Sequence, residues 1–98
     1  MIIVIGRALA KSNSLKELLD LSLVHVQRSR KEPGCLSHAV HQDAENPLRL
    51  VFVEEWADRA SLEQHFRVPA SRDFVRAARA LAAEPPTINV FDADLLQL

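Results

Sequence analysis

Four side chains near the middle of this 98-residue chain could carry proton-transfer chemistry: Glu54, Glu55, Trp56 and His65. Imidazole is the side chain whose ordinary pKa lies nearest neutrality, so His65 is a candidate general base or acid. A neighbouring carboxylate could fix its tautomer, and an indole could form a flat wall against an aromatic ring. The alternative is that these residues only complete a small core.

The segment that ends at Trp56 is read as a strand, because it contains the continuous apolar run Leu-Val-Phe-Val. Successive side chains of a strand point to opposite faces, so Phe52, Glu54 and Trp56 share one face and Glu55 lies on the other. The two carboxylates are therefore not expected to act as a pair. Glu54 is the carboxylate predicted to orient His65, with a structural ion pair as its alternative role.

The helix that carries His65 is expected to start at an Asp58 cap and to run for about ten residues, until Val68-Pro69 breaks it. Spacing at i, i+3, i+4 and i+7 predicts one inward stripe on this helix, formed by Leu62, His65, Phe66 and Pro69. His65 is therefore predicted to face the sheet rather than solvent.

A longer helix is expected from a capping box at Ser14 and Glu17 to about Lys31, where Pro33-Gly34 ends it. Its predicted inward arc consists of Leu15, Leu18, Leu19, Ser22, His25, Val26 and Ser29. Polar groups on a buried arc need partners or water, so this arc suggests a cavity between helices and sheet. Ser22 and His25 are candidate ligand contacts there.

The remaining candidates carry weaker signals. His38 lies on a strand expected at the sheet edge, where it is either structural or lines the pocket, and His41 has the opposite parity. Arg76 belongs to a row of arginines on one helix face, which indicates a solvated surface or, less simply, an anion contact. Cys35 has no base placed for it and is interpreted as a small buried hydrophobe.

The full pattern is β-α-β-β-α-β, the order of the ferredoxin-like α+β fold with a four-stranded antiparallel sheet. One domain spans residues 1–98, and the predicted strands are 2–5, 35–42, 48–56 and 87–91, with helices at 14–31, after 58, and at 71–83. The first and third strands read as central because both are continuous apolar runs. Helices on one side leave the other sheet face bare, so we expect a homodimer with sheet-to-sheet packing.

Composition excludes several classes of function. A net charge of -1 does not favour nucleic acid or a membrane surface, and the apolar start is too short for a membrane span. One cysteine suits a reducing cytoplasm. Without a cysteine pair or a His-x-x-x-His spacing no metal site is expected, and two glycines are too few for a phosphate-binding loop.

The turn Glu32-Pro-Gly-Cys-Leu36, the hairpin end Glu54-Glu-Trp56, the segment from Ala60 to His65 and the helix around Phe74 together resemble the antibiotic biosynthesis monooxygenase family. The resemblance covers nearly the whole chain. It implies a dimeric α+β barrel and a pocket between sheet and helices in each subunit. It also implies oxidation of reduced aromatics by O₂ without metal or flavin, hence no cofactor. Related proteins degrade haem or isomerise a small phosphorylated ketone.

Three departures from the family pattern limit what the resemblance implies. His38 stands where members often carry tyrosine, and the chain has no tyrosine. Gly6 stands where the haem-degrading relatives carry asparagine, which disfavours haem degradation. Phe52 replaces a residue that is polar in some quinone-forming relatives.

The leading hypothesis is a cofactor-independent monooxygenase acting with O₂ on a small electron-rich phenol or quinol. His65 would be the base, Glu54 would orient it, and Trp56 would hold the ring. Further predicted substrate contacts are Ser22, His25, His38, Phe52, Phe66 and Arg76. The alternatives are an isomerase or tautomerase that uses the same histidine, and a non-catalytic ligand-binding dimer.

Overall fold

The computed structural model describes residues 1–98 and contains a four-stranded antiparallel sheet with three helices. In chain order the elements are β1 (Ile2–Leu9), α1 (Leu15–Ser29), β2 (Cys35–Gln42), β3 (Arg49–Trp56), α2 (Arg59–Arg67), α3 (Pro69–Leu81) and β4 (Thr87–Asp92). The strands lie in the order β2-β3-β1-β4. The ferredoxin-like plan and the central position of the first and third strands are therefore confirmed.

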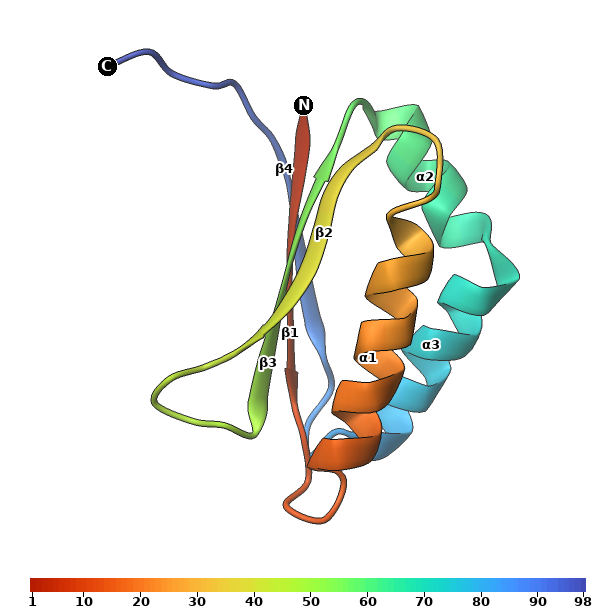
Figure 1. Cartoon of the computed structure of the whole chain (residues 1–98), viewed down its shortest axis with the longest axis vertical. Helices are drawn as coiled ribbons and strands as arrows, with labels where there is room; N and C mark the ends of the chain where they lie inside the picture. The colour runs from red at the N-terminus through yellow and green to blue at the C-terminus, as the bar shows by residue number, and fades with distance from the viewer.

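All three helices lie on one side of the sheet (Figure 1). Burial along β3 alternates strictly, and Leu50, Phe52, Glu54 and Trp56 are the buried members. These four side chains face the helices. The opposite face of the sheet has no helix over it (Figure 1).

The first strand is longer than predicted, because it continues through Gly6, Arg7 and Ala8 to Leu9. None of these three residues extends the apolar run, so composition gave no strand signal there. Pairing with β3 along its whole length and with β4 along most of it holds this segment extended. Gly6 and Ala8 thereby occupy the helix-facing side of the sheet centre, where they leave space.

The second strand differs from prediction at its start. Leu36 lies two residues before His38, so strand parity would place both on one face, but Leu36 is exposed because the register shifts between Cys35 and Ser37. A bulge of this kind adds one residue to one strand and reverses the side-chain parity before it. His38 itself is buried on the helix side.

The helix ends follow partly from local chemistry. Asp58 caps α2, and its Oδ1 accepts a hydrogen bond of 2.8 Å from the Ser61 N–H. This hydrogen bond also holds the pKa of Asp58 below its ordinary value. The capping box predicted at Ser14 does not form, because the Ser14 hydroxyl bonds Asn13 instead. The next helix, α3, starts at Pro69, which suits a first-turn position that needs no N–H donor.

Gly34 is the one residue with positive φ, at 79°. It ends the turn after α1 and packs directly on α2. A Cβ at this position would overlap the Ser61 side chain, approaching its Cβ to 2.5 Å. Its carbonyl accepts a hydrogen bond of 2.8 Å from the Ala57 N–H. Glycine is therefore required here both by conformation and by the close approach of the two segments.

No helix in the structure combines the length and the apolar character that crossing a bilayer requires.

Candidate active site

A pocket of about 400 Å³ lies between the sheet and the helices, within the size range of small-molecule sites. Its sheet side is formed by Gly6, Ala8 and Phe52, and its helix side by Phe74 and Ala78 among others. The pocket exists because three of these residues are small: Gly6 has no side chain and the two alanines reach only a short way into the space. Most of the lining surface is apolar, and its buried polar residues are His25, Glu54, His65 and Ser71.

His65 is held by a carboxylate that the sequence interpretation missed. The Nδ1 atom of His65 lies 2.7 Å from Oε1 of Glu32, and both side chains are largely buried. A carboxylate accepts hydrogen bonds, so in its neutral form His65 carries the proton on Nδ1 and keeps a lone pair on Nε2. This is the arrangement by which a carboxylate orients a catalytic histidine in hydrolytic triads. The Glu32–His65 dyad therefore presents a base to the pocket.

Glu54 does not take the role predicted for it. Its Oε1 accepts a hydrogen bond of 2.9 Å from the Trp56 indole N–H and lies 3.2 Å from Nε2 of His38. Burial alone would raise the pKa of Glu54, but the neighbouring His38 and the indole N–H outweigh it and hold the pKa below its ordinary value. His38 is at ion-pair distance from Glu54, although neither of its ring nitrogens has a well-aligned hydrogen-bond partner.

His25 enters the pocket from α1 and is 6% exposed. Its ring stacks on Phe74 with centroids 4.1 Å apart and an interplanar angle of 9°. Nδ1 of His25 lies 2.7 Å from the Arg28 guanidinium. Burial, together with His38, His65 and Arg28, lowers the pKa of His25 to about 3. His25 is therefore a neutral imidazole at physiological pH.

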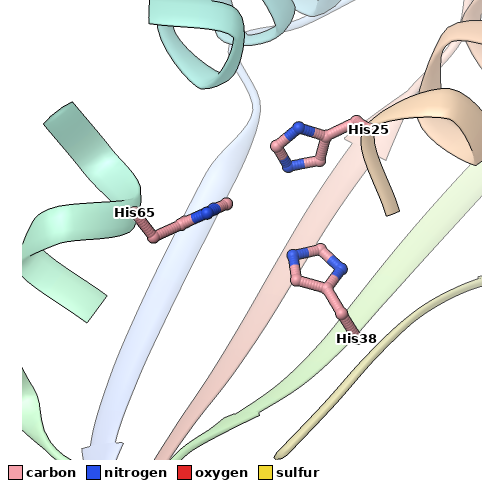
Figure 2. Close-up of side chains that lie close together, drawn as sticks. All are labelled: His25, His38 and His65. Carbon is pink, nitrogen blue, oxygen red and sulfur yellow. The ribbon is translucent and has the colours of Figure 1, made fainter. Parts of the chain in front are cut away.

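The imidazoles of His25, His38 and His65 converge on one small space (Figure 2). Their nitrogens lie within 4.8 Å of one another, whereas a tetrahedral ion bound at ordinary zinc distances needs nitrogens about 3.4 Å apart. The rings would have to draw together to hold a metal. Arg28 also donates to Nδ1 of His25, which leaves the proton rather than a lone pair on the other ring nitrogen. The cluster as placed fits a set of hydrogen-bonding groups better than a metal centre.

Several predicted contacts lie outside the pocket. Trp56 is fully buried beneath His65, with ring centroids 4.7 Å apart, and forms no wall of the cavity. His38 is likewise buried behind the lining. Ser22 bonds the Leu18 carbonyl of its own helix at 2.7 Å, so its hydroxyl needs no cavity. Arg76 is exposed, pairs with Asp73 and does not line the pocket.

Other predicted contacts do border the pocket. Phe52 lines it from the sheet as expected. Phe66 lines it too, but it is 43% exposed rather than inward-facing. Arg72 and Arg79, which belong to the same row of arginines as Arg76, also border the pocket. Cys35 is half-buried and unpaired, and burial raises the pKa of its thiol, which agrees with an unreactive role.

Glu32 and Arg28 were the functional residues that the sequence did not identify. Arg28 lies 2.7 Å from His25 and 3.6 Å from Glu32, and Glu32 lies against His65. Arg28 lies in the last turn of α1, and Glu32 was considered only as the first residue of the turn that carries the family resemblance. The i, i+4 spacing of Arg28 and Glu32 was the available signal, because it predicts an ion pair next to His25.

Comparisons with known proteins identify the family. The sequence profile described as antibiotic biosynthesis monooxygenase matches residues 1–77. A crystal structure described as an antibiotic biosynthesis monooxygenase is 30% identical, with a TM-score of 0.89 over 97% of this chain and 100% of that one. A Deinococcus radiodurans protein described by the same family name has a TM-score of 0.94 at 23% identity, covering 100% of this chain and 97% of its own.

An uncharacterised protein of Synechocystis sp., sll1783, is 33% identical over 90 residues, which are 92% of this chain. Those residues make up 61% of that protein, so the chain spans about three-fifths of the length of this relative. The ferredoxin-like fold, the structural similarity and the profile match over residues 1–77 all indicate the same family. The chain belongs to the antibiotic biosynthesis monooxygenase family.

Proposed function

We propose that the pocket is the active site of a monooxygenase that uses O₂ and no cofactor to oxidise a small phenol or quinol. The observation that carries this proposal is the Glu32–His65 dyad, whose base opens on a mainly apolar pocket large enough for one flat ring. A histidine tautomer fixed by a carboxylate is prepared to remove a weakly acidic proton. Membership of the family supports the same general type of activity.

The proposed reaction begins when Nε2 of His65 takes the phenolic proton. The phenolate is electron-rich enough to reduce O₂ directly, and recombination at a free ring carbon forms a hydroperoxide. Loss of the proton on that carbon with cleavage of the O–O bond releases water and leaves a quinone. One oxygen atom enters the product and the other becomes water, so phenol plus O₂ gives quinone plus water without an external reductant.

The substrate ring is proposed to lie against the wall that Phe52 and Phe74 form together, rather than against Trp56. The two phenylalanine rings touch edge to face, with centroids 5.9 Å apart at an angle of 68°, and both line the pocket. Apolar walls exclude water from the phenolate and from the reactive oxygen species. Trp56 instead supports His65 from below and bonds Glu54.

An oxygen electrode with a panel of phenols and hydroquinones tests the proposal. We expect oxygen uptake in the presence of a metal chelator, and ¹⁸O₂ should place one labelled atom in the quinone. Turnover that persists at the same rate under argon would assign the chain to the isomerase class instead. Binding of a phenol that is recovered unchanged in air, across the panel, would identify a ligand-binding protein.

We further propose that the chain forms a homodimer through the sheet face opposite the helices. By strand register, Ile5 and Val53 are paired on that face, with Val51 beside them, and they are only partly buried in the single chain. A central apolar stripe of this kind needs a cover, and a second copy of the same sheet supplies one.

Analytical ultracentrifugation of the native protein should therefore give the molecular mass of a dimer. Val53→Glu is expected to give one chain, because the carboxylate would be buried without a partner in the interface. Val24→Glu, at a residue 64% exposed on the outer side of α1, is the matched control and should stay dimeric. A native protein that sediments as a monomer at high concentration would contradict this interface.

A further inference from the structure

His25 is fixed in one tautomer by the group behind it. A guanidinium only donates hydrogen bonds, so the Arg28 contact of 2.7 Å makes Nδ1 of His25 an acceptor. A neutral imidazole with an accepting Nδ1 carries its proton on Nε2. The ring cannot easily turn to exchange the two nitrogens, because it is stacked on Phe74. His25 therefore offers an N–H donor on the side of the ring away from Arg28.

His65 has the complementary arrangement, since Glu32 holds its proton on Nδ1 and leaves a lone pair on Nε2. The two rings have centroids 5.4 Å apart, and both side chains line the pocket. They point into one space (Figure 2). No hydrogen bond joins the two rings directly. One acceptor and one donor thus face the same point from two different helices.

We propose that the Nε2–H of His25 is an oxyanion donor: it bonds the same substrate oxygen from which His65 removes the proton. The ligand of this site is the oxygen of a phenolate or an enolate. As the proton leaves, charge develops on that oxygen, and a donor already aimed at it stabilises the anion without rearranging. This inference rests on the proposed function for the identity of the base.

A neutral donor suits this position better than a cationic one. A protonated His25 would stand beside Arg28 and face His38 and His65, with Glu32 and Glu54 as the nearest carboxylates. Burial and these neighbours keep the ring uncharged, so it cannot donate its proton outright to the product anion. A neutral imidazole that polarises a substrate oxygen is an established catalytic device. Arg28 is a positioning residue in this scheme, since it touches His25 and not the substrate.

Two measurements test the inference. Nitrogen-15 NMR of the resting protein should show His25 with Nδ1 unprotonated and Nε2 protonated, and Arg28→Met should give a mixture of tautomers. Absorbance titration of 4-nitrophenol bound to the protein should give a phenol pKa below that of the free compound. His25→Phe keeps a flat ring on Phe74 and should raise that bound pKa by one unit or more, which is about tenfold in the ionisation constant.

His41→Phe is the matched control, because His41 is exposed and has no place in the pocket. Protonation of His25 on Nδ1 would overturn the inference, as would equal bound pKa values in the native and His25→Phe proteins or failure of nitrophenolate to bind. Phenolate stabilisation without oxygen uptake from any phenol would defeat the oxygenase proposal and leave the donor intact. Oxygen uptake that stays unchanged in His25→Phe would support the oxygenase proposal and would show that His25 is not the oxyanion donor.

Discussion

A His65→Gln protein is expected to lose oxygen-dependent turnover by about 10²- to 10⁴-fold in kcat, the range that a positioned general base supplies. Glutamine is close in size and can still donate a hydrogen bond to Glu32, so the fold should be retained. The pocket would keep its shape and its affinity for the ring, because the aromatic walls are untouched. The loss should therefore fall on kcat and leave KM nearly unchanged.

Glu32→Gln provides the graded counterpart of this variant. Its amide oxygen can still accept from Nδ1 of His65, so the tautomer is preserved, but the charge that stabilises the protonated ring during the reaction is lost. Since charge-assisted hydrogen bonds contribute about 1.5–3 kcal/mol, we expect kcat to fall roughly ten- to a hundredfold. Glu55→Gln, on the other sheet face and bonded to Ser37, is the matched control. Full activity in His65→Gln would remove the dyad from the mechanism.

The second large effect concerns stability in mild acid. Folding lowers the pKa of His25 from 6.5 to about 3, mainly because the ring is buried. Between these two values the unfolded chain binds one more proton than the folded protein, so stability falls as pH decreases, by about 1.4 kcal/mol for each pH unit. From pH 7 to pH 5 the expected loss from His25 is about 2 kcal/mol.

Urea unfolding at pH 7, 6 and 5 measures this dependence. The charged and titratable groups around His25 are Arg28, Glu32, His38, Glu54 and His65. His25→Phe removes only the His25 contribution, so the native protein should lose about 2 kcal/mol more than this variant over the interval. Glu54, whose pKa is lowered by folding, acts in the same direction at lower pH, where its carboxylate gains a proton in the unfolded chain before it does in the folded protein. Parallel pH curves for the two proteins would show that His25 is not buried as a neutral ring.

Local pattern determined most of the fold in advance. Continuous apolar runs predicted the two central strands, and the inward arcs of α1 and α2 were correct at Leu18, His25 and His65. Sequence patterns did not predict the second half of β1, because this segment is held extended by its hydrogen-bonded pairing with β3 and β4 rather than by its own composition. Pro69 and Phe66 were predicted to face inward but are exposed. Pro69 starts α3 instead of continuing the stripe of α2, and Phe66 lies in the last turn of α2 at the border of the pocket.

The site was predictable only one element at a time. Helical spacing placed His65 inward, and strand parity separated Glu54 from Glu55. Neither rule can reveal that the carboxylate next to His65 comes from Glu32, 33 residues earlier in the chain. Ser22 and Ser29 are buried as predicted, but Ser22 was wrongly predicted to contact a ligand. Each serine hydroxyl donates to a carbonyl one turn back in its own helix, so neither needs a partner in the pocket.

The close approach of Gly34 to Ser61 has a consequence for the proton transfer proposed for His65. Glu32 lies two residues before this contact and His65 lies one helical turn after it, so a single backbone junction sets the separation of the two members of the dyad. A side chain at position 34 would push Ser61 away, and because Ser61 and His65 belong to the same helix, α2, the His65 imidazole would move with it. A substitution at Gly34, which lies outside the pocket, is thus expected to change the 2.7 Å separation of Glu32 and His65. This turn is a place where evolution can tune proton transfer without reshaping the pocket.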